Sequence, residues 1–401
     1  MKRDHVFIYV QHLLGIGHLK RAASLARAIA GEGMGVTLAS GGVPVPDLDL
    51  DGVEFVQLPP VSAVDVSFKV LVDENNLPIT PAWRDKRMKA LLAAWRAARA
   101  DALVIELFPF GRRQMRFEIL PLLEDALVRR PRPVVACSVR DVLQAGPNTA
   151  MRAPQVLAWL ERYFDHVLVH GDPVFVPFSA SFSDAERIAH MIEHTGYVTN
   201  RPSPAAKGDA VEGDVGGEAG ANEVLVSAGG GAVGYRLLET AILAWPLSKQ
   251  RSQVWRLLSG VNLPERDFAR LQSLAASHGD VRIIVERTRS DFQTLLANCR
   301  VSISQGGYNT VIEALFAGAR ALVVPFSDGA ESEQALRAEL LARRGLVEVL
   351  HETQLSPESL AAAIDHTACR APPAAHALNL DGGAQSARLL RGWMAQREQE
   401  G

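Results

Sequence analysis

Strand-like apolar runs alternate with amphipathic stretches along almost the whole 401-residue chain. In the first half, the strand-like runs are 5–10, 35–40, 53–58, 101–107, 133–139 and 166–170, and the clearest helical patterns are 19–30, 81–100, 113–129 and 154–164. This alternation indicates βα units, whose parallel strands form a sheet covered by helices on both faces. The chain is therefore predicted to be an α/β protein.

Residues 201–222 interrupt the alternation. Their sequence, RPSPAAKGDAVEGDVGGEAGAN, is rich in Pro, Gly, Ala and Asp, which predicts a flexible linker. Beyond it the pattern restarts, with strand-like runs at 223–228, 253–258, 281–286, 301–304, 320–326 and 346–350 and helical patterns at 235–245, 309–316, 333–343 and 384–399.

The length of the chain suits two domains of roughly 150–200 residues each rather than one ordinary core. We expect one αβα domain at 1–200 and a second at 223–380, joined by the linker at 201–222. The final segment, 381–401, is expected to carry a helix that packs back on the first domain.

Composition and charge exclude several classes of protein. A net charge of −3, without a clustered basic excess, gives no reason to expect a nucleic-acid partner. The three cysteines, Cys137, Cys299 and Cys369, are too few and too scattered for a disulfide framework or a spaced zinc site. No apolar run is long enough to span a bilayer and no signal peptide precedes the first strand, so we expect a cytoplasmic protein, with peripheral contact at the inner face of the membrane left open.

A glycine-containing turn, QHLLGIGHL, directly follows the first predicted strand. In open α/β sheets, ligands bind beyond the carboxyl ends of the strands, where such turns lead into helices. Gly15 and Gly17 would let a ligand approach the backbone, His18 would open the helix, and His12 is a second imidazole. The dinucleotide fingerprint does not fit, because a third glycine is missing. A plain tight turn remains an alternative.

Two further glycine turns lie in the second half. Gly229, Gly230 and Gly231 follow a predicted strand, and three consecutive glycines are costly to order unless a ligand must touch the main chain. The other turn, in SQGGYNTVIEALFAG (304–318), leads into a helix whose amino end suits a pyrophosphate. Glu313 lies one turn into that helix, where its carboxylate could accept the hydroxyls of a ribose. An ordinary capped helix with a surface glutamate is the alternative.

The run from Gly306 to Gly345 resembles the donor-binding region of GT-B glycosyltransferases, in particular the lipid II-forming UDP-N-acetylglucosaminyltransferase family. It is also similar to natural-product and plant UDP-sugar transferases, whose acidic residue and glutamine touch the donor sugar. The turn that ends at His18 resembles the N-terminal glycine loop of that family, although Ile16 stands where the family has glycine. The resemblance implies two Rossmann-like αβα domains that face each other across a cleft, with the acceptor bound by the N-terminal one.

The resemblance further implies an inverting, metal-independent transfer from a nucleoside-diphosphate sugar, with UDP as the expected nucleotide and no cofactor. No Asp-x-Asp triplet directly follows a predicted strand, which also argues against a metal-bridged diphosphate. The donor-binding residues that the resemblance implies are Gly229, Gly230 and Gly231 in the family's second glycine loop, Gly306, Gly307, Asn309 and Thr310 at the diphosphate, Glu313 at the ribose, Glu333 and Gln334 at the sugar, and Arg287 and Thr288 at the base.

The N-terminal domain is expected to hold the catalytic base and an unknown small-molecule, glycan or lipid-linked acceptor. His18 is the first candidate for the base, since an imidazole titrates near neutral pH, and Asp141 is the second. Glu106 joins His12, Gly15 and Gly17 on the acceptor side, although Glu106 and Asp141 could each form a routine ion pair or cap. A UDP-sugar 2-epimerase, a nucleotide-sugar hydrolase and a non-catalytic nucleotide-sugar-binding protein remain alternatives.

Overall fold

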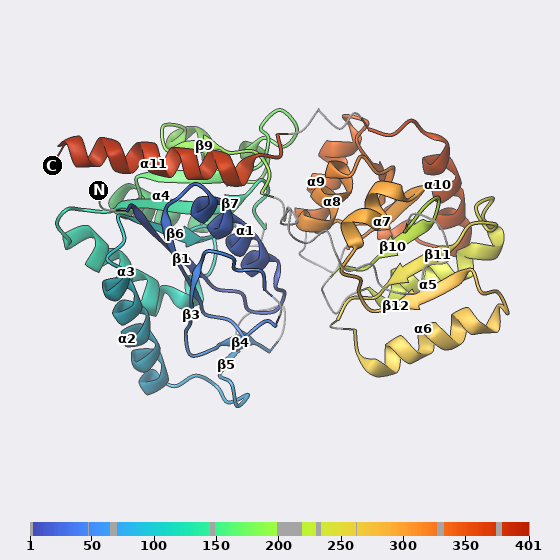
Figure 1. Cartoon of the computed structure of the whole chain (residues 1–401), viewed down its shortest axis with the longest axis horizontal. Helices are drawn as coiled ribbons and strands as arrows, with labels where there is room; N and C mark the ends of the chain where they lie inside the picture. The colour runs from blue at the N-terminus through green and yellow to red at the C-terminus, as the bar shows by residue number, and fades with distance from the viewer. Residues whose placement is uncertain are drawn as a thin grey trace. The chain divides into compact units, whose positions relative to one another are not determined.

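The computed structural model describes residues 3–46, 48–64, 70–144, 149–198, 219–229, 234–261, 263–326, 333–373 and 379–400. The chain divides into two compact units (Figure 1). Unit 1 is Met1–Leu143, Pro147–Arg201 and Asn379–Gly401, and unit 2 is Gln144–Gly146 and Pro202–Leu378. Gly230, Gly231 and most of the segment expected to be a linker, 201–218, lie outside the described residues.

Unit 1 is built on a seven-stranded parallel sheet with the strand order β3-β2-β1-β6-β7-β8-β9. Its strands are β1 (His5–Val10), β2 (Gly35–Ser40), β3 (Glu54–Gln57), β6 (Ala102–Glu106), β7 (Val134–Arg140), β8 (His166–His170) and β9 (Ile192–His194). A short antiparallel ribbon, β4 (Ser62–Ala63) and β5 (Leu71–Val72), stands apart from it. The strand order reverses between β1 and β6, which makes the loops beyond these two strands the expected place for a ligand.

Helices cover both faces of this sheet. They are α1 (Gly17–Gly31), α2 (Pro81–Ala98), α3 (Arg116–Val128), α4 (Thr149–Tyr163) and α11 (Gly382–Glu400). Successive residues of β1 alternate between two cores, because side chains of a strand point to opposite faces. Phe7 and Tyr9 pack with α2, α3 and α4, whereas Val6, Ile8 and Val10 pack with α1 and α11.

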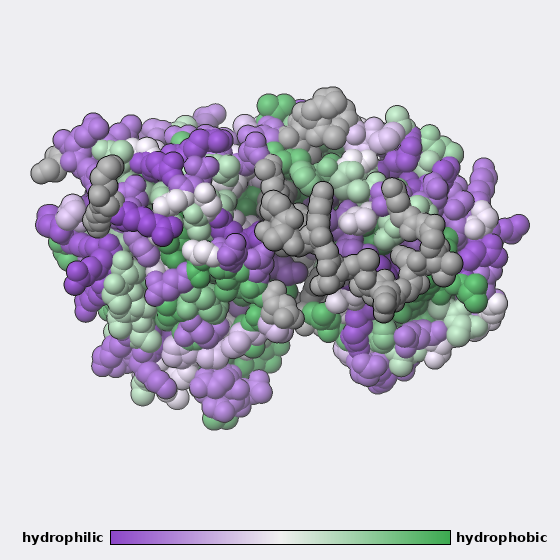
Figure 2. Space-filling view, in the orientation of Figure 1, coloured by the Kyte–Doolittle hydropathy of each residue, from purple (hydrophilic) through white to green (hydrophobic). Residues whose placement is uncertain are grey.

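The last helix, α11, belongs to unit 1 and packs against α1. Ala387, Leu390 and Met394 form its buried stripe, at the spacing of an amphipathic helix. The Trp393 ring stacks on His166 with the ring centres 3.6 Å apart. Hydrophilic residues predominate on the outside of this helix in the face shown in Figure 2. The C-terminal segment therefore completes one face of the sheet of unit 1.

Unit 2 contains a six-stranded parallel sheet in the order β12-β11-β10-β13-β14-β15. Its strands are β10 (Val224–Ser227), β11 (Trp255–Leu258), β12 (Ile283–Glu286), β13 (Val301–Ser304), β14 (Ala321–Val323) and β15 (Glu348–Val349). Its helices are α5 (Tyr235–Ala244), α6 (Glu265–Ser277), α7 (Phe292–Asn298), α8 (Tyr308–Phe316), α9 (Glu333–Ala342) and α10 (Pro357–Cys369). Here the order reverses between β10 and β13, the strands that precede the second and third glycine turns. The α/β fold with parallel sheets is confirmed.

Among the described helices, none is both long enough and apolar enough to cross a lipid bilayer.

Candidate functional site

His18 and Glu106 meet at the carboxyl edge of the sheet of unit 1. His18 is the second residue of α1, and Glu106 is the last residue of β6, the strand beside β1. The His18 Nδ1 atom lies 2.9 Å from Glu106 Oε1. The His18 side chain is 14% exposed and that of Glu106 is 2% exposed. The imidazole is thus held by a buried carboxylate, while a small part of the His18 side chain remains accessible.

Burial is the largest cause that lowers the pKa of His18 well below its usual value of 6.5, and the charges of Arg140, Arg112 and Arg21 lower it further. An adjacent carboxylate would act in the opposite direction. The Glu106 charge, however, is already compensated by Arg21, whose Nη2 donates to the same Oε1 atom. We therefore assign His18 as neutral at pH 7. Glu106 can only accept, and its Oε1 atom at 2.9 Å lies nearer to Nδ1 than the Arg21 Nη2 donor does at 3.5 Å. We therefore assign the ring hydrogen to Nδ1 and the lone pair to Nε2.

The second oxygen of Glu106 continues into a chain of hydrogen bonds. Ser138 Oγ lies 2.6 Å from Glu106 Oε2 and 3.0 Å from His170 Nε2, and His170 Nδ1 lies 2.9 Å from Thr195 Oγ1. The sequence analysis placed His170 at the end of the strand-like run 166–170 but did not identify it, Ser138, Thr195 or Arg21 as site residues. The available signal was a serine inside an otherwise apolar strand, VVACSVR.

His12 is part of the packing of the first loop. Its ring is buried, and its Nε2 atom lies 3.0 Å from the Val43 carbonyl oxygen. A Cβ on Gly42 would lie 2.3 Å from the His12 ring, and one on Gly41 would lie 2.0 Å from Arg87 Nη2. The two glycines at the end of β2 therefore make room for neighbouring side chains.

The other residues expected on the acceptor side differ in their surroundings. Gly15 has no atom within 4 Å of an added Cβ, so packing does not require a glycine there, and Gly17 is the first residue of α1. Asp141 is fully buried, and its Oδ1 accepts from the Val142 amide at 2.8 Å. Of the candidate acids, Glu106 is the one that the fold places against the His18 ring.

In unit 2, the second and third glycine turns lie together because β10 pairs with β13. Gly229 has a φ of +72°, a conformation that favours glycine, and an added Cβ there would lie 3.7 Å from Thr310 Oγ1. The helix α8 begins at Tyr308 with Gly307 as its N-cap and without a side-chain cap hydrogen bond. Asn309 and Thr310 are half-buried in its first turn. The amino end of α8 thus has the features of an anion site.

Glu313, Gly306 and Gly307 extend this edge. Glu313 is half-buried on the second turn of α8. An added Cβ on Gly306 would lie 3.0 Å from Gln334 Cβ, which gives this glycine a packing reason, whereas one on Gly307 would meet no atom within 4 Å. Packing therefore does not explain why residue 307 is a glycine.

Glu333 and Gln334 open α9, and both have protein partners. Glu333 Oε1 lies 2.8 Å from Nη2 of the fully buried Arg337. Gln334 Oε1 accepts from the Phe326 amide at 3.1 Å. Arg337 also reaches the Gly306 carbonyl at 3.4 Å, so α9 is fastened to the third glycine turn.

Arg287 and Thr288 follow β12, at the outer side of the sheet. The Arg287 guanidinium donates to the Leu263 carbonyl at 2.8 Å and to Glu265 at 2.5 Å, and it lies over the Phe268 ring. Thr288 is exposed. The side chain of Arg287 is thus occupied by α6, and a contact with a base would come from the main chain.

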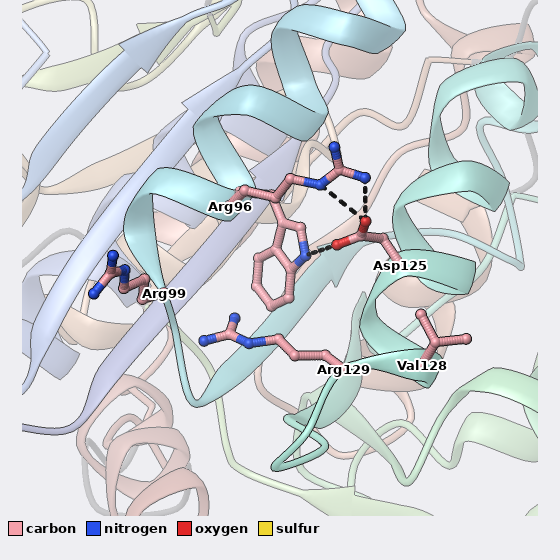
Figure 3. Close-up of a pocket in the computed structure, with 6 residues that line it drawn as sticks. Arg96, Arg99, Asp125, Val128 and Arg129 are labelled. Carbon is pink, nitrogen blue, oxygen red and sulfur yellow. Dashed lines mark hydrogen bonds and ion pairs between the residues drawn. The ribbon is translucent and has the colours of Figure 1, made fainter.

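A separate pocket of about 410 Å³ lies on unit 1 between the last turns of α2 and α3 (Figure 3). It is lined by Trp95, Arg96, Arg99, Asp125, Val128 and Arg129. Asp125 accepts from Trp95 Nε1 at 3.0 Å and from Arg96 Nε at 2.9 Å. The two helices end where the chain enters β6 and β7, so this pocket is at the opposite edge from His18. Cations at helix C-termini complement the helix dipole, which explains these arginines without a ligand.

Residues 230–379 match the model of the glycosyltransferase family 28 C-terminal domain. Two curated relatives carry the name UDP-N-acetylglucosamine–N-acetylmuramyl-(pentapeptide) pyrophosphoryl-undecaprenol N-acetylglucosamine transferase. The protein of Syntrophotalea carbinolica is 29% identical over 219 residues, which are 53% of this chain and 58% of that protein. The protein of Brucella anthropi is 33% identical over 112 residues, which are 25% of this chain and 30% of that protein. The matches thus span less than two thirds of either relative.

Solved structures match over almost the whole chain. MurG of Acinetobacter baumannii superposes with a TM-score of 0.60 at 16% identity, covering 97% of this chain and 99% of that one. Os79 of O. sativa, solved in complex with UDP, gives a TM-score of 0.61 at 14% identity, covering 98% and 100%. The fold is GT-B. The expected resemblance to the lipid II-forming family is also confirmed, and the GT-B fold explains why one chain carries two Rossmann-like units.

Proposed function

We propose that this GT-B protein is a glycosyltransferase that moves a sugar from a UDP-sugar to an acceptor hydroxyl with inversion. The observation that carries the proposal is the family 28 match over residues 230–379, which contains the whole edge from α8 to α9. The order reversal between β10 and β13 supports it, since ligands of open α/β sheets bind at such a point.

Unit 2 is proposed to hold the donor. The diphosphate lies at the amino end of α8 against Gly229, Gly307, Asn309 and Thr310, where backbone amides and the helix dipole stabilise the leaving diphosphate without a divalent metal. Glu313 accepts hydrogen bonds from the ribose hydroxyls. The remaining donor contacts are those that the resemblance implies: Gly230 and Gly231 in the second glycine loop, Gly306 at the diphosphate, Glu333 and Gln334 at the sugar, and the main chain of Arg287 and Thr288 at the base.

Unit 1 is proposed to supply the base. The acceptor oxygen attacks the anomeric carbon, its proton moves to His18 Nε2, the bond from the anomeric carbon to the diphosphate oxygen breaks, and UDP leaves. Glu106 holds Nδ1–H and stabilises the imidazolium that forms. The names of the curated relatives specify a pyrophosphoryl-undecaprenol acceptor. We propose by extension a lipid-linked acceptor, used by a cytoplasmic protein at the inner face of the membrane.

UDP is expected to stabilise the protein in the absence of magnesium. At a UDP concentration one hundred times its dissociation constant, binding linkage gives about 2.7 kcal/mol. The measurement is a thermal shift in buffer with EDTA, repeated with magnesium and with ADP, GDP and dTDP. Stabilisation that appears only when magnesium is present would contradict the helix-dipole account of diphosphate binding.

Glu313→Ala is expected to weaken UDP binding by roughly 1.5–3 kcal/mol, because a charge-assisted contact to the ribose is lost. Calorimetric titration with UDP measures the change. Glu339→Ala, which removes another half-buried glutamate from unit 2, serves as the control and should bind UDP like the wild type. Equal affinities for all three proteins would remove Glu313 from the site.

Glu333→Gln and Gln334→Ala are expected to weaken binding of the intact UDP-sugar more than binding of UDP alone. Glutamine is chosen at position 333 because its amide oxygen can still accept from the buried Arg337, which alanine would leave without this partner. Titrations of each variant with UDP and with the sugar nucleotide measure the difference. Equal losses for both ligands would mean that this pair does not contact the sugar.

A further inference from the structure

A line of four polar side chains crosses the carboxyl edge of unit 1, from Glu106 on β6 through Ser138 on β7 and His170 on β8 to Thr195, which follows β9. Successive members are 2.6, 3.0 and 2.9 Å apart. All four are at most 2% exposed. The proposed reaction gives no direct role to the last three. Buried polar groups in such a line need hydrogen bonds that run in one consistent direction, because each group left without a partner costs free energy of folding.

The direction of these hydrogen bonds follows from the chemistry of the first member. A carboxylate can only accept, so the Ser138 hydroxyl donates to Glu106 Oε2. The hydroxyl has only one hydrogen, and therefore His170 must donate its Nε2–H to Ser138. Burial, together with the charge of Arg21, lowers the pKa of His170 from 6.5 to about 3, so the ring is neutral and its Nδ1 carries no hydrogen. This Nδ1 atom lies 2.9 Å from the Thr195 hydroxyl, which also lies 2.9 Å from the Gly196 carbonyl oxygen. Donation thus runs from His170 to Ser138 and from Ser138 to Glu106.

We propose that Ser138 and His170 are positioning residues that fix the tautomer of His18 through Glu106. With Ser138 on Oε2, and with Arg21 and His18 on Oε1, the carboxylate is held at both oxygens and cannot turn away from the imidazole. His18 then keeps its hydrogen on Nδ1 and its lone pair on Nε2. The catalytic consequence rests on the proposed function, but the tautomer itself does not.

The charges that face His18 come from several elements. Glu106 belongs to β6, Arg21 to α1 and Arg140 to β7, while His12 and Arg112 lie in the loops that follow β1 and β6. None of these is changed by substitutions at Ser138 or His170. A change in the His18 ring in such variants would therefore report the hydrogen bonds through Glu106.

The test is nitrogen NMR of histidine-labelled protein, with the His18 signals identified by their loss in His18→Gln. The wild type is expected to show one tautomer, with Nδ1 protonated and Nε2 bare. Ser138→Ala and His170→Phe should each give a mixture of tautomers. His170→Gln, whose amide can still donate to Ser138, should restore the single tautomer. Ser302→Ala removes another buried strand serine, on β13, and should leave His18 unchanged.

Where transfer is measurable, Ser138→Ala and His170→Phe are expected to lower kcat about tenfold with KM nearly unchanged, the effect typical of partners that orient a histidine. Folding is checked by circular dichroism and by the UDP-induced thermal shift. Unchanged His18 signals in both folded variants would overturn the proposal, even if sugar transfer is found. Mixed tautomers with His170→Gln restored would support it, even if no sugar transfer is found with any donor.

Discussion

His18→Ala is expected to lower kcat about 10²–10⁴-fold, the usual contribution of a positioned general base. The neutral ring, held by Glu106, is poised to accept the acceptor proton at Nε2. The pKa of His18 lies well below 6.5 in the folded protein. In the wild type, the loss of kcat on the acid side should therefore have its midpoint below pH 6.5. UDP affinity and the melting temperature should stay near those of the wild type, because the side chain is proposed to act only in the chemical step.

Glu106→Gln tests the same pair from the other side. The amide can donate to His18 Nδ1, which favours the tautomer that carries its hydrogen on Nε2, so that Nε2 cannot accept the acceptor proton. The double variant, His18→Ala with Glu106→Gln, should therefore have a kcat little lower than that of either single variant, since the two residues act as a unit. His194→Ala, at the end of β9, is the control. A fall of less than about tenfold for His18→Ala would place the base elsewhere, and Asp141 would be tested next.

Glu118→Ala is expected to destabilise unit 1 by about 3–5 kcal/mol, because it leaves a buried guanidinium without its carboxylate. Neither side chain of the Arg87–Glu118 pair is exposed, and Arg87 Nε lies 2.9 Å from Glu118 Oε2. Arg87 also donates to Gln11 Oε1 at 2.7 Å, and the Tyr9 hydroxyl donates to Glu118. The pair thus ties α2 and α3 to the end of β1, directly before the loop that leads to His18.

Urea unfolding followed by tryptophan fluorescence measures this effect. Glu124→Ala is the matched control, since Glu124 is also on α3 but is 44% exposed, and an exposed ion pair contributes at most about 1 kcal/mol. Replacement of both partners, Arg87→Met with Glu118→Leu, should cost less than Glu118→Ala alone, because no unpaired charge remains buried. Equal losses for Glu118→Ala and Glu124→Ala would show that the buried pair has no special role in stability.

The strands were predictable because those of a parallel sheet are buried on both faces and appear as continuous apolar runs. The runs 5–10, 35–40, 166–170 and 301–304 coincide with β1, β2, β8 and β13. The runs 320–326 and 346–350 exceed the paired strands β14 and β15, because apolar character continues past the last ladder hydrogen bonds. The helices α6, α7 and α10 were missed, although the strand pattern already required crossovers between parallel strands where α6 and α7 lie.

The local features could be predicted from the sequence: two series of βα units, glycine turns after strands, and His18 at the start of a helix. These depend on neighbours along the chain, and a periodicity or a turn signal records them. The three-dimensional fold was needed to show that Glu106, rather than Asp141, contacts His18, and that Ser138 and His170 continue the hydrogen bonds from Glu106. Such contacts join residues that are 32 to 88 positions apart, and they depend on strand order and register. Apart from a polar residue inside an apolar strand, such as Ser138, long-range side-chain geometry of this kind leaves no pattern in the chain.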